Sequence, residues 1–149
     1  SAIVGTDKHM DASGPNSLGG TYTGSPTACA AALAVLEVFK EEDILGQSQR
    51  LGSTLKSRFE EWQEKYEHVD NVRALGSMAA IELVSDKQGR EPRPDMAAAV
   101  CAYAAEHGLI LLSCGLHGNT VRFLMPVTIE DNILQEGLQI VEDALKSLS

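Results

Sequence analysis

Long apolar runs, clusters of basic residues and metal-ligand spacings are all missing from this 149-residue sequence. No apolar run approaches the roughly 20 residues that cross a bilayer, and the chain does not open with the charged lead and apolar stretch of a signal peptide. With 21 acidic and 12 basic residues the formal net charge is −9, which argues against a nucleic-acid or membrane partner. No metal site is expected, because no ligand spacing connects His9, His68, His107 and His117.

Cysteine is scarce, with three residues at no metal-ligand spacing, an odd number that does not suggest a disulfide framework. Cys29 and Cys101 lie among alanines in helical patterns, so we predict that the cysteines are buried free thiols. Free thiols persist in a reducing compartment, and a cytoplasmic protein is therefore expected. The apolar share of 44% is that of a globular chain, and the length allows one core of ordinary size or one domain with a trailing arm.

The stretch from Leu18 to Phe39 joins a glycine-rich turn to an alanine-rich helical pattern. It reads Leu-Gly-Gly-Thr-Tyr-Thr-Gly-Ser-Pro, and apolar residues then recur at three- and four-residue spacing. Ser25 is a suitable N-cap, and Pro26 suits the first helical position, where a missing N–H costs nothing. The pattern predicts a long helix from Pro26, with an apolar face of small side chains that packs closely against other backbone.

Thr21 follows Gly20 just ahead of this helix and offers a hydroxyl to an anion. Free amides and the positive end of a helix dipole favour a phosphate at such a place. A tight turn before a well-capped helix, with no ligand, explains the same residues, because Gly-Gly turns before helices are common. The residues alone leave both interpretations open.

Helices and short strands are expected to alternate through the rest of the chain. One helix should bury a stripe formed by Leu51, Leu55, Phe59, Trp62 and Tyr66. Residues 71–84 are typical of two short strands, or of one strand bent at Gly76. An alanine-rich helix over residues 95–107 follows, with Gly108 as its C-terminal cap.

Two more strands and a final helix complete the expected order. Residues 109–113 are predicted to form a buried strand, and residues 120–125 a strand that Pro126 ends. Thr128 is expected to cap the final helix with Asp131 at N3, and apolar residues then recur at Leu134, Leu138, Val141, Leu145 and Leu148. This order predicts an α+β fold in which helices pack on a small, mostly antiparallel sheet.

Arg122 is an unexpected residue in the middle of an apolar strand. Val121 and Phe123 alternate with Arg122, so the arginine should lie on the opposite face of the sheet. A guanidinium there can bind a carboxylate through two parallel hydrogen bonds. An exposed charge on an open sheet face, or a structural pair with a nearby glutamate, is an equally weighted alternative.

The motif Gly-Gly-Thr-Tyr-x-Gly-x-Pro and the helix after it resemble a segment of the class III aminotransferases, the ornithine and 4-aminobutyrate type. The resemblance implies pyridoxal 5′-phosphate (PLP) as the cofactor of the whole enzyme. It also implies that Gly20 and Thr21 bind the cofactor phosphate, and that Thr21 does so in the partner subunit's site of a homodimer. Ser25 stands where the family usually has Asn, a change that keeps the helix cap.

Two later segments carry the same resemblance. Residues 107–115 and 122–131 are similar to the end of the 4-aminobutyrate aminotransferases, and residues 72–78 match the family's Val-Arg-Gly-Leu-Gly-x-Met with Ala74 in place of Gly. The likeness implies that Arg122 binds the α-carboxylate of the 2-oxo acid. It implies a glutamate outside this sequence that pairs with the arginine when the substrate has no carboxylate there. Arg73 is assigned to structure.

The chain is therefore expected to be the C-terminal part of a fold-type I enzyme. Residues 1–23 would end the large cofactor domain, residues 24–46 would hold a long connecting helix, and residues 47–149 would form the small α+β domain. The resemblance implies that the catalytic lysine, which forms the Schiff base, lies upstream of Ser1. Lys8 is the nearest candidate in this sequence, but it is expected to be solvated in a polar loop. Alone, the chain should neither bind PLP nor transaminate.

Amino groups of 4-aminobutyrate, or of a similar ω-amino acid, would pass to 2-oxoglutarate in the full enzyme. Another class III activity, on ornithine, acetylornithine or diaminobutyrate, is the alternative within the family. From a different class, a non-catalytic α+β module for binding or dimerisation also fits the pattern.

Overall fold

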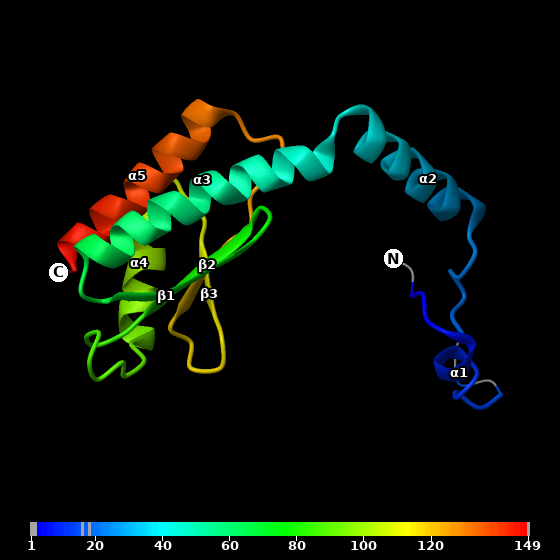
Figure 1. Ribbon diagram of the computed structural model, residues 1–149, viewed down its shortest axis with the longest axis horizontal. Helices are drawn as coiled ribbons and strands as arrows, with labels where there is room; N and C mark the ends of the chain where they lie inside the picture. The colour runs from blue at the N-terminus through cyan, green and yellow to red at the C-terminus, as the bar shows by residue number, and fades with distance from the viewer. Residues whose placement is uncertain (1–2, 16, 18, 149) are drawn as a thin grey trace. The chain divides into compact units, whose positions relative to one another are not determined.

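The computed structural model describes residues 3–15, 17 and 19–148, and the chain divides into two compact units, Ser1–Glu41 and Glu42–Ser149. Leu18, the first residue of the glycine-rich motif, lies outside the described residues. No helix in the described part of the chain is long and apolar enough to cross a membrane. Figure 1 gives the order of the elements along the chain.

The first unit contains a short helix, α1 (Asp7–Met10), and the predicted long helix, α2 (Pro26–Glu41). Lys8 was predicted to lie in a polar loop, but it lies in α1 and is exposed there. Helix α2 begins at Pro26 as expected, and the Ser25 carbonyl accepts its first hydrogen bond, from the Cys29 amide at 2.9 Å. Among the described residues of this unit, no α2 side chain is buried, and Leu33 and Leu36 are 63% and 58% exposed. The prediction that Cys29 is buried is therefore wrong, because no described residue of this unit covers that face of the helix.

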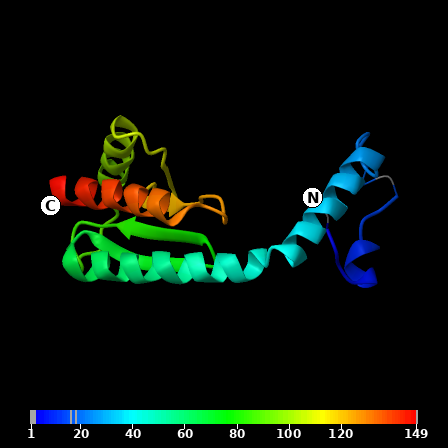
Figure 2. The ribbon, with the colours of Figure 1, turned by 90° about the horizontal axis from the view of Figure 1, so that it is seen from above.

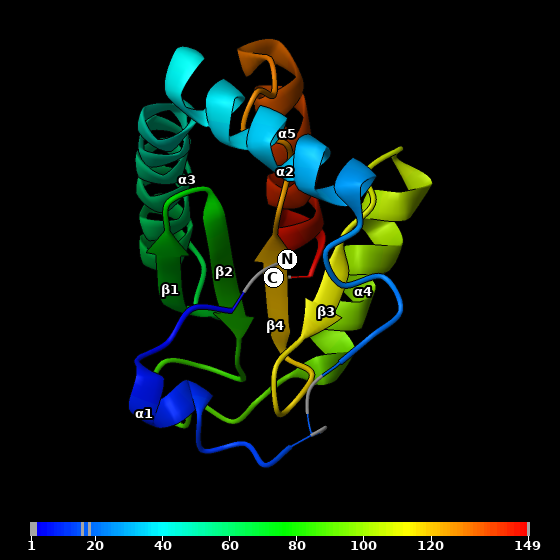
Figure 3. The same ribbon diagram turned by 90° about the vertical axis from the view of Figure 1, so that its right-hand side faces the viewer.

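The second unit is an antiparallel sheet with helices on one face. Its elements follow the order α3 (Ile44–Lys65), β1 (Val69–Leu75), β2 (Met78–Leu83), α4 (Pro94–Glu106), β3 (Leu112–Cys114), β4 (Thr120–Phe123) and α5 (Asp131–Ser147). In space the strands lie in the order β1-β2-β4-β3, as Figure 3 shows. Buried side chains of α3, α4 and α5 form one core cluster with those of the strands, which confirms the predicted α+β class. Figure 2 shows α3 (cyan to green), α4 (yellow-green) and α5 (orange to red) around the green strands.

Aromatic rings form the centre of the core under that face. Phe59 of α3 stacks on Trp62, with ring centroids 5.1 Å apart, and meets Phe123 of β4 at 4.5 Å. The predicted stripe on α3 is fully confirmed, because all five of its members are buried, as are Leu134, Leu138, Val141 and Leu145 of α5. Burial of these large side chains is the main term that stabilises the unit.

One acidic side chain joins α3 to α5 inside this layer. Glu142 is buried, and its carboxylate accepts hydrogen bonds from Lys65 Nζ at 2.5 Å, from the Tyr66 hydroxyl at 3.2 Å and from Arg58 Nη1 at 3.3 Å. A buried carboxylate is costly unless its oxygens are paired, and here several donors pair them. The pKa of Glu142 is lowered, first by the hydrogen bond from Lys65.

Backbone packs directly on backbone where α3 meets the turn between β1 and β2. Gly52 of α3 faces Gly76, which has a φ of +55° in that turn, and a Cβ added to Gly52 would lie 2.1 Å from the Gly76 carbonyl oxygen. The Ser77 amide donates to Ser48 Oγ at 3.0 Å beside this contact. The sequence pattern left one bent strand or two short strands open, and the turn at Gly76 makes them two.

The segment before β4 differs from its prediction as a buried strand. Strand β3 begins only at Leu112, since the Leu109 amide is bonded to the Ala104 carbonyl of the preceding helix end at 2.8 Å. Ile110 and Leu112 are 87% and 60% exposed in this chain, because β3 is an edge strand and covers little of the core. Cys101 and Cys114 are free thiols, as predicted, but both are half-buried.

The final helix begins later than the sequence predicts. Helix α5 begins at Asp131, with Glu130 in the N-cap position and no side-chain cap. The Ile129 amide donates to the Pro126 carbonyl at 3.1 Å, so Thr128 belongs to a turn and not to a capping box. The capping prediction for Thr128 and Asp131 is therefore wrong.

Candidate functional site

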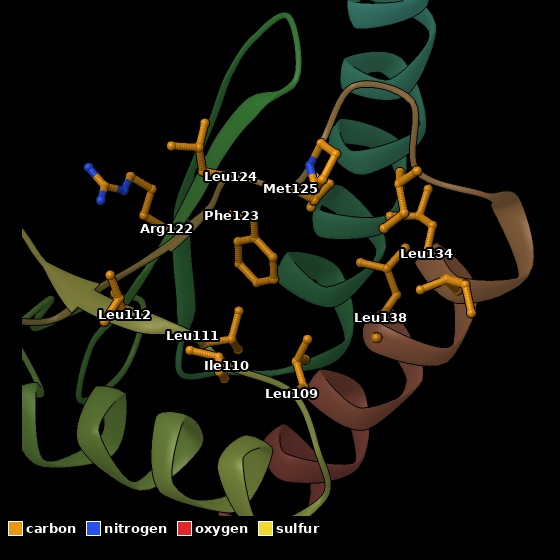
Figure 4. A pocket seen from close by; sticks show the side chains of 14 residues that line it. Leu109, Ile110, Leu111, Leu112, Arg122, Phe123, Leu124, Met125, Leu134 and Leu138 are labelled. Atoms are coloured by element: carbon orange, nitrogen blue, oxygen red, sulfur yellow. The ribbon is translucent and has the colours of Figure 1, made fainter.

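Arg122 projects from β4 on the face of the sheet that the helices leave open. Val121 and Phe123 on either side of it are buried in the core, which confirms the predicted alternation. Figure 4 shows the Arg122 side chain directed away from the side on which Phe123 lies. The strand therefore holds a guanidinium at a fixed register while its neighbours anchor the backbone.

The neighbours of Arg122 in the sheet leave space beside it. Ala80 of β2 lies directly across on one side and Leu112 of β3 on the other. A cavity of about 370 Å³ opens on this face, and its lining includes Ala80, Arg122, Cys114 and Thr120. Among the described residues, Arg122 forms no ion pair, so the structural pairing that the sequence left open is not found there. Its donors are available to an anion.

An apolar cavity of about 410 Å³ lies on the other side of Arg122, between the strand ends and α5. Figure 4 shows its lining, which comes from residues 109–112, from residues 122–126, from Ile129 and from one side of α5. Among the described residues that line it, Arg122 is the only charged one. Arg122 is exposed, and Figure 4 shows its guanidinium directed away from Phe123, Leu134 and Leu138, so the rest of this cavity is apolar.

A second arginine shares the open face. Arg73 of β1 lies across from Ala80, and it forms an ion pair with Glu82 of β2. The sequence assigned Arg73 to structure. Arg73 also lies on the same face of the sheet as Arg122. Sequence reasoning missed this row, because β1 shifts register between Asp70 and Arg73 and no pattern in the chain announces that irregularity.

Gly20 and Thr21 lie in a turn that leads into α2. The Thr23 amide donates to the Gly20 carbonyl at 3.1 Å, the Ser25 amide donates to the Tyr22 carbonyl at 3.2 Å, and Gly24 adopts a φ of +73° that favours glycine. Thr21 is exposed, as is Gly20. A free hydroxyl and amides ahead of a helix fit a phosphate group, so these residues suit the phosphate of PLP. Gly20 and Thr21 belong to the first unit, and Arg122 to the second.

The fold of this chain is similar to that of part of solved aminotransferase structures. One similar solved structure is that of an amine transaminase from an uncultivated Pseudomonas species in its PLP-bound form. The match covers 91% of this chain and 30% of the transaminase, with a TM-score of 0.78 and 32% sequence identity. A Bacillus anthracis aminotransferase gives a TM-score of 0.79 at 30% identity, over 85% of this chain and 29% of its own.

The model of the aminotransferase class-III family matches residues 1–145, so the chain belongs to that family. A probable 4-aminobutyrate aminotransferase of Bacillus subtilis is 45% identical over 99% of this chain and 34% of its own length. A 5-aminovalerate aminotransferase of Pseudomonas aeruginosa is 48% identical over 100% of this chain and 35% of its own. The chain thus spans about a third of the length of the curated relatives it matches.

Proposed function

We propose that this chain is the C-terminal part of a PLP-dependent aminotransferase that transfers the amino group of 4-aminobutyrate, or of a similar ω-amino acid, to 2-oxoglutarate. Family membership and two relatives named for 4-aminobutyrate and 5-aminovalerate support the reaction and the donor class. The observation that carries the proposal is Arg122, which faces an open cavity with no ion pair among the described residues.

Arg122 would bind the α-carboxylate of the 2-oxo acid. Its planar guanidinium offers two parallel donors, which fix both the charge and the orientation of a carboxylate. Val121 and Phe123 hold the strand in the core, so the backbone at Arg122 is fixed and its side chain is kept on the open face before the substrate arrives. Binding of the α-carboxylate at a fixed place in turn positions the neighbouring carbonyl carbon of the 2-oxo acid for the reaction.

Gly20 and Thr21 would bind the cofactor phosphate in the partner subunit's site of a homodimer. When bound, PLP supplies the electron sink for the amino-group transfer. The proposal places the Schiff-base lysine outside these 149 residues. Lys8, in the short helix α1, is exposed, whereas a Schiff-base lysine needs an enclosed setting. The chain alone is therefore proposed to be inactive.

The division of labour along the chain is part of the same proposal. Residues 1–23 would complete the cofactor domain, residues 24–46 would connect it, and residues 47–149 would bring Arg122 to the substrate. The exposed apolar side chains of α2 support this arrangement, because they need a cover that the first unit does not supply. We also propose a cytoplasmic location, because free thiols persist in a reducing compartment.

Steady-state kinetics of Arg122→Lys in the full-length enzyme test the proposed role of the arginine. Lysine keeps the charge but loses the two-pronged contact, so KM for 2-oxoglutarate should rise roughly 10- to 100-fold. The folded state should hardly change, because the side chain lies outside the core. Arg50→Gln, which removes an exposed arginine paired with Asp43 at 3.5 Å, is the matched control and should behave as wild type. Unchanged KM in Arg122→Lys would remove this residue from the site.

A panel of amino donors tests the reaction itself. The full-length enzyme should prefer 4-aminobutyrate or 5-aminovalerate to ornithine, acetylornithine and diaminobutyrate. A preference for ornithine would contradict the proposed donor class. The absence of any transamination would favour the alternative of a non-catalytic binding module.

Borohydride reduction tests the proposed inactivity of the chain alone. The 149-residue chain, mixed with PLP and reduced, should give no stoichiometric adduct by intact mass. One specific adduct, at Lys8 or elsewhere, would mean that the chain holds its own lysine site.

A further inference from the structure

Three residues form one row across the open face of the sheet. Arg73 of β1 pairs in register with Ala80 of β2, and Ala80 pairs with Arg122 of β4. Two arginines therefore flank a single alanine, and both line the same cavity of about 370 Å³. The methyl group of Ala80 is too short to separate them.

Glu82 is placed to reach either arginine. It follows Ala80 by two positions on β2, so it shares the open face, and its cross-strand partners are Asp70 and Thr120. Arg73 and Arg122 thus lie on the two diagonals from Glu82, and diagonal neighbours in a sheet are about 7–8 Å apart, within reach of long side chains. The structure pairs Glu82 with Arg73 and leaves Arg122 without an ion pair among the described residues.

Glu82 needs a cation on this face. Asp70 lies directly opposite on β1, and like charges at that position are unfavourable. Asp70 already has its own partner, Arg90, at 2.7 Å. The side chains of Arg73 and Glu82 are 47% and 27% exposed, so their pair is accessible to exchange and not locked in the core.

We propose that Arg73 is a positioning residue that holds Glu82 away from Arg122 and so keeps Arg122 free for the carboxylate of the 2-oxo acid. This inference rests on the proposed function. Without Arg73, Glu82 turns to the remaining guanidinium of the row and competes with the substrate. An exposed ion pair of this kind weakens carboxylate binding by about two- to fivefold.

Chemical labelling of the 149-residue chain tests the exchange without any enzyme activity. p-Hydroxyphenylglyoxal reacts with guanidines that are free of ion pairs, and peptide mass spectrometry gives the rate at each arginine. Labelling of Arg122 should slow about two- to fivefold in Arg73→Gln and recover in Arg73→Gln/Glu82→Gln. Arg73→Lys retains a cation for Glu82 and should label as wild type, as should the control Arg50→Gln. Equal labelling of Arg122 in all variants would overturn the proposal.

Kinetics of the full-length enzyme test the consequence for the substrate. Arg73→Gln should raise KM for 2-oxoglutarate about two- to fivefold with little change in kcat, and Glu82→Gln in the same chain should restore it. A merely structural Arg73 predicts damage that the second substitution does not repair, and that result would refute the positioning role. If wild type does not use 2-oxoglutarate, the proposed function fails while the labelling still decides whether Glu82 exchanges partners.

Discussion

Two helical glycines, Gly52 in α3 and Gly137 in α5, should respond in opposite ways to replacement by alanine. Helix propensity favours alanine over glycine by about 1 kcal/mol at either position. A Cβ on Gly52 would lie 2.1 Å from the carbonyl oxygen of Gly76 and 2.5 Å from its carbonyl carbon, distances that the backbone cannot accept without moving. A Cβ on Gly137 would meet Leu109 Cδ1 at 3.6 Å, an ordinary contact.

The magnitudes follow from these contacts. Overpacking of a core costs up to about 3 kcal/mol, and the clash at Gly52 is with backbone, which relaxes less than a side chain. Helix propensity returns about 1 kcal/mol, so Gly52→Ala should lower the free energy of unfolding by about 2 kcal/mol. Gly137→Ala has no clash to offset and should raise it by about 1 kcal/mol.

Urea denaturation followed by tryptophan fluorescence measures both effects. The sequence has one tryptophan, Trp62, and it is 1% exposed in the core of the second unit, so its emission reports the unfolding of that unit. The midpoint should fall for Gly52→Ala and rise for Gly137→Ala, with similar slopes. A Gly52→Ala chain at least as stable as wild type would refute the close approach of α3 to the turn at Gly76.

Three further measurements address the core and the titrating groups. Phe59→Ala should lower the free energy of unfolding by about 3–5 kcal/mol in the same assay, and a loss below about 1 kcal/mol would contradict its central place. The hydrogen bond from Lys65 lowers the pKa of Glu142 from its usual 4.5, so the stabilising contribution of the carboxylate is complete above pH 4.5 and is lost as the pH falls through the lowered folded-state value. The urea midpoint of Glu142→Gln should therefore change less between pH 7 and pH 3, in roughly the range of carboxyl titration, than that of wild type, and equal changes would argue against the pairing. Burial raises the pKa of the Cys101 thiol, so a disulfide reagent near neutral pH should label exposed Cys29 faster, and equal rates would count against this assignment.

The helices of the second unit were predictable because their apolar spacing is regular. Leu55 and Phe59 recur at the period of a helix, and both are completely buried in α3. The alternation around Arg122 was equally predictable, because side chains in a strand point to opposite faces in turn. Val121 and Phe123 face the core, so Arg122 lies on the other face. The class of fold followed from the order of these elements.

The exposure of individual residues was less predictable than their secondary structure. Cys29 sits in a correctly predicted helix yet is exposed, because a helical pattern says which face is apolar and not what covers it. Ile110 was expected in a buried strand, but hydrogen bonds to the preceding helix delay β3 and leave it open. Thr128 is a residue type that often caps helices, but here it lies in a turn that the hydrogen bond from the Ile129 amide to the Pro126 carbonyl closes.

Local sequence thus determined the helices, the strand parity that turns Arg122 from the core, and the motifs that place the chain in its family. Only the tertiary structure decided strand order and register, and with them the row of Arg73, Ala80 and Arg122. The physical reason is the range of the forces involved. Periodicity and capping act within a few residues, whereas the pairing of Glu82 with one arginine and not the other depends on which distant strands meet.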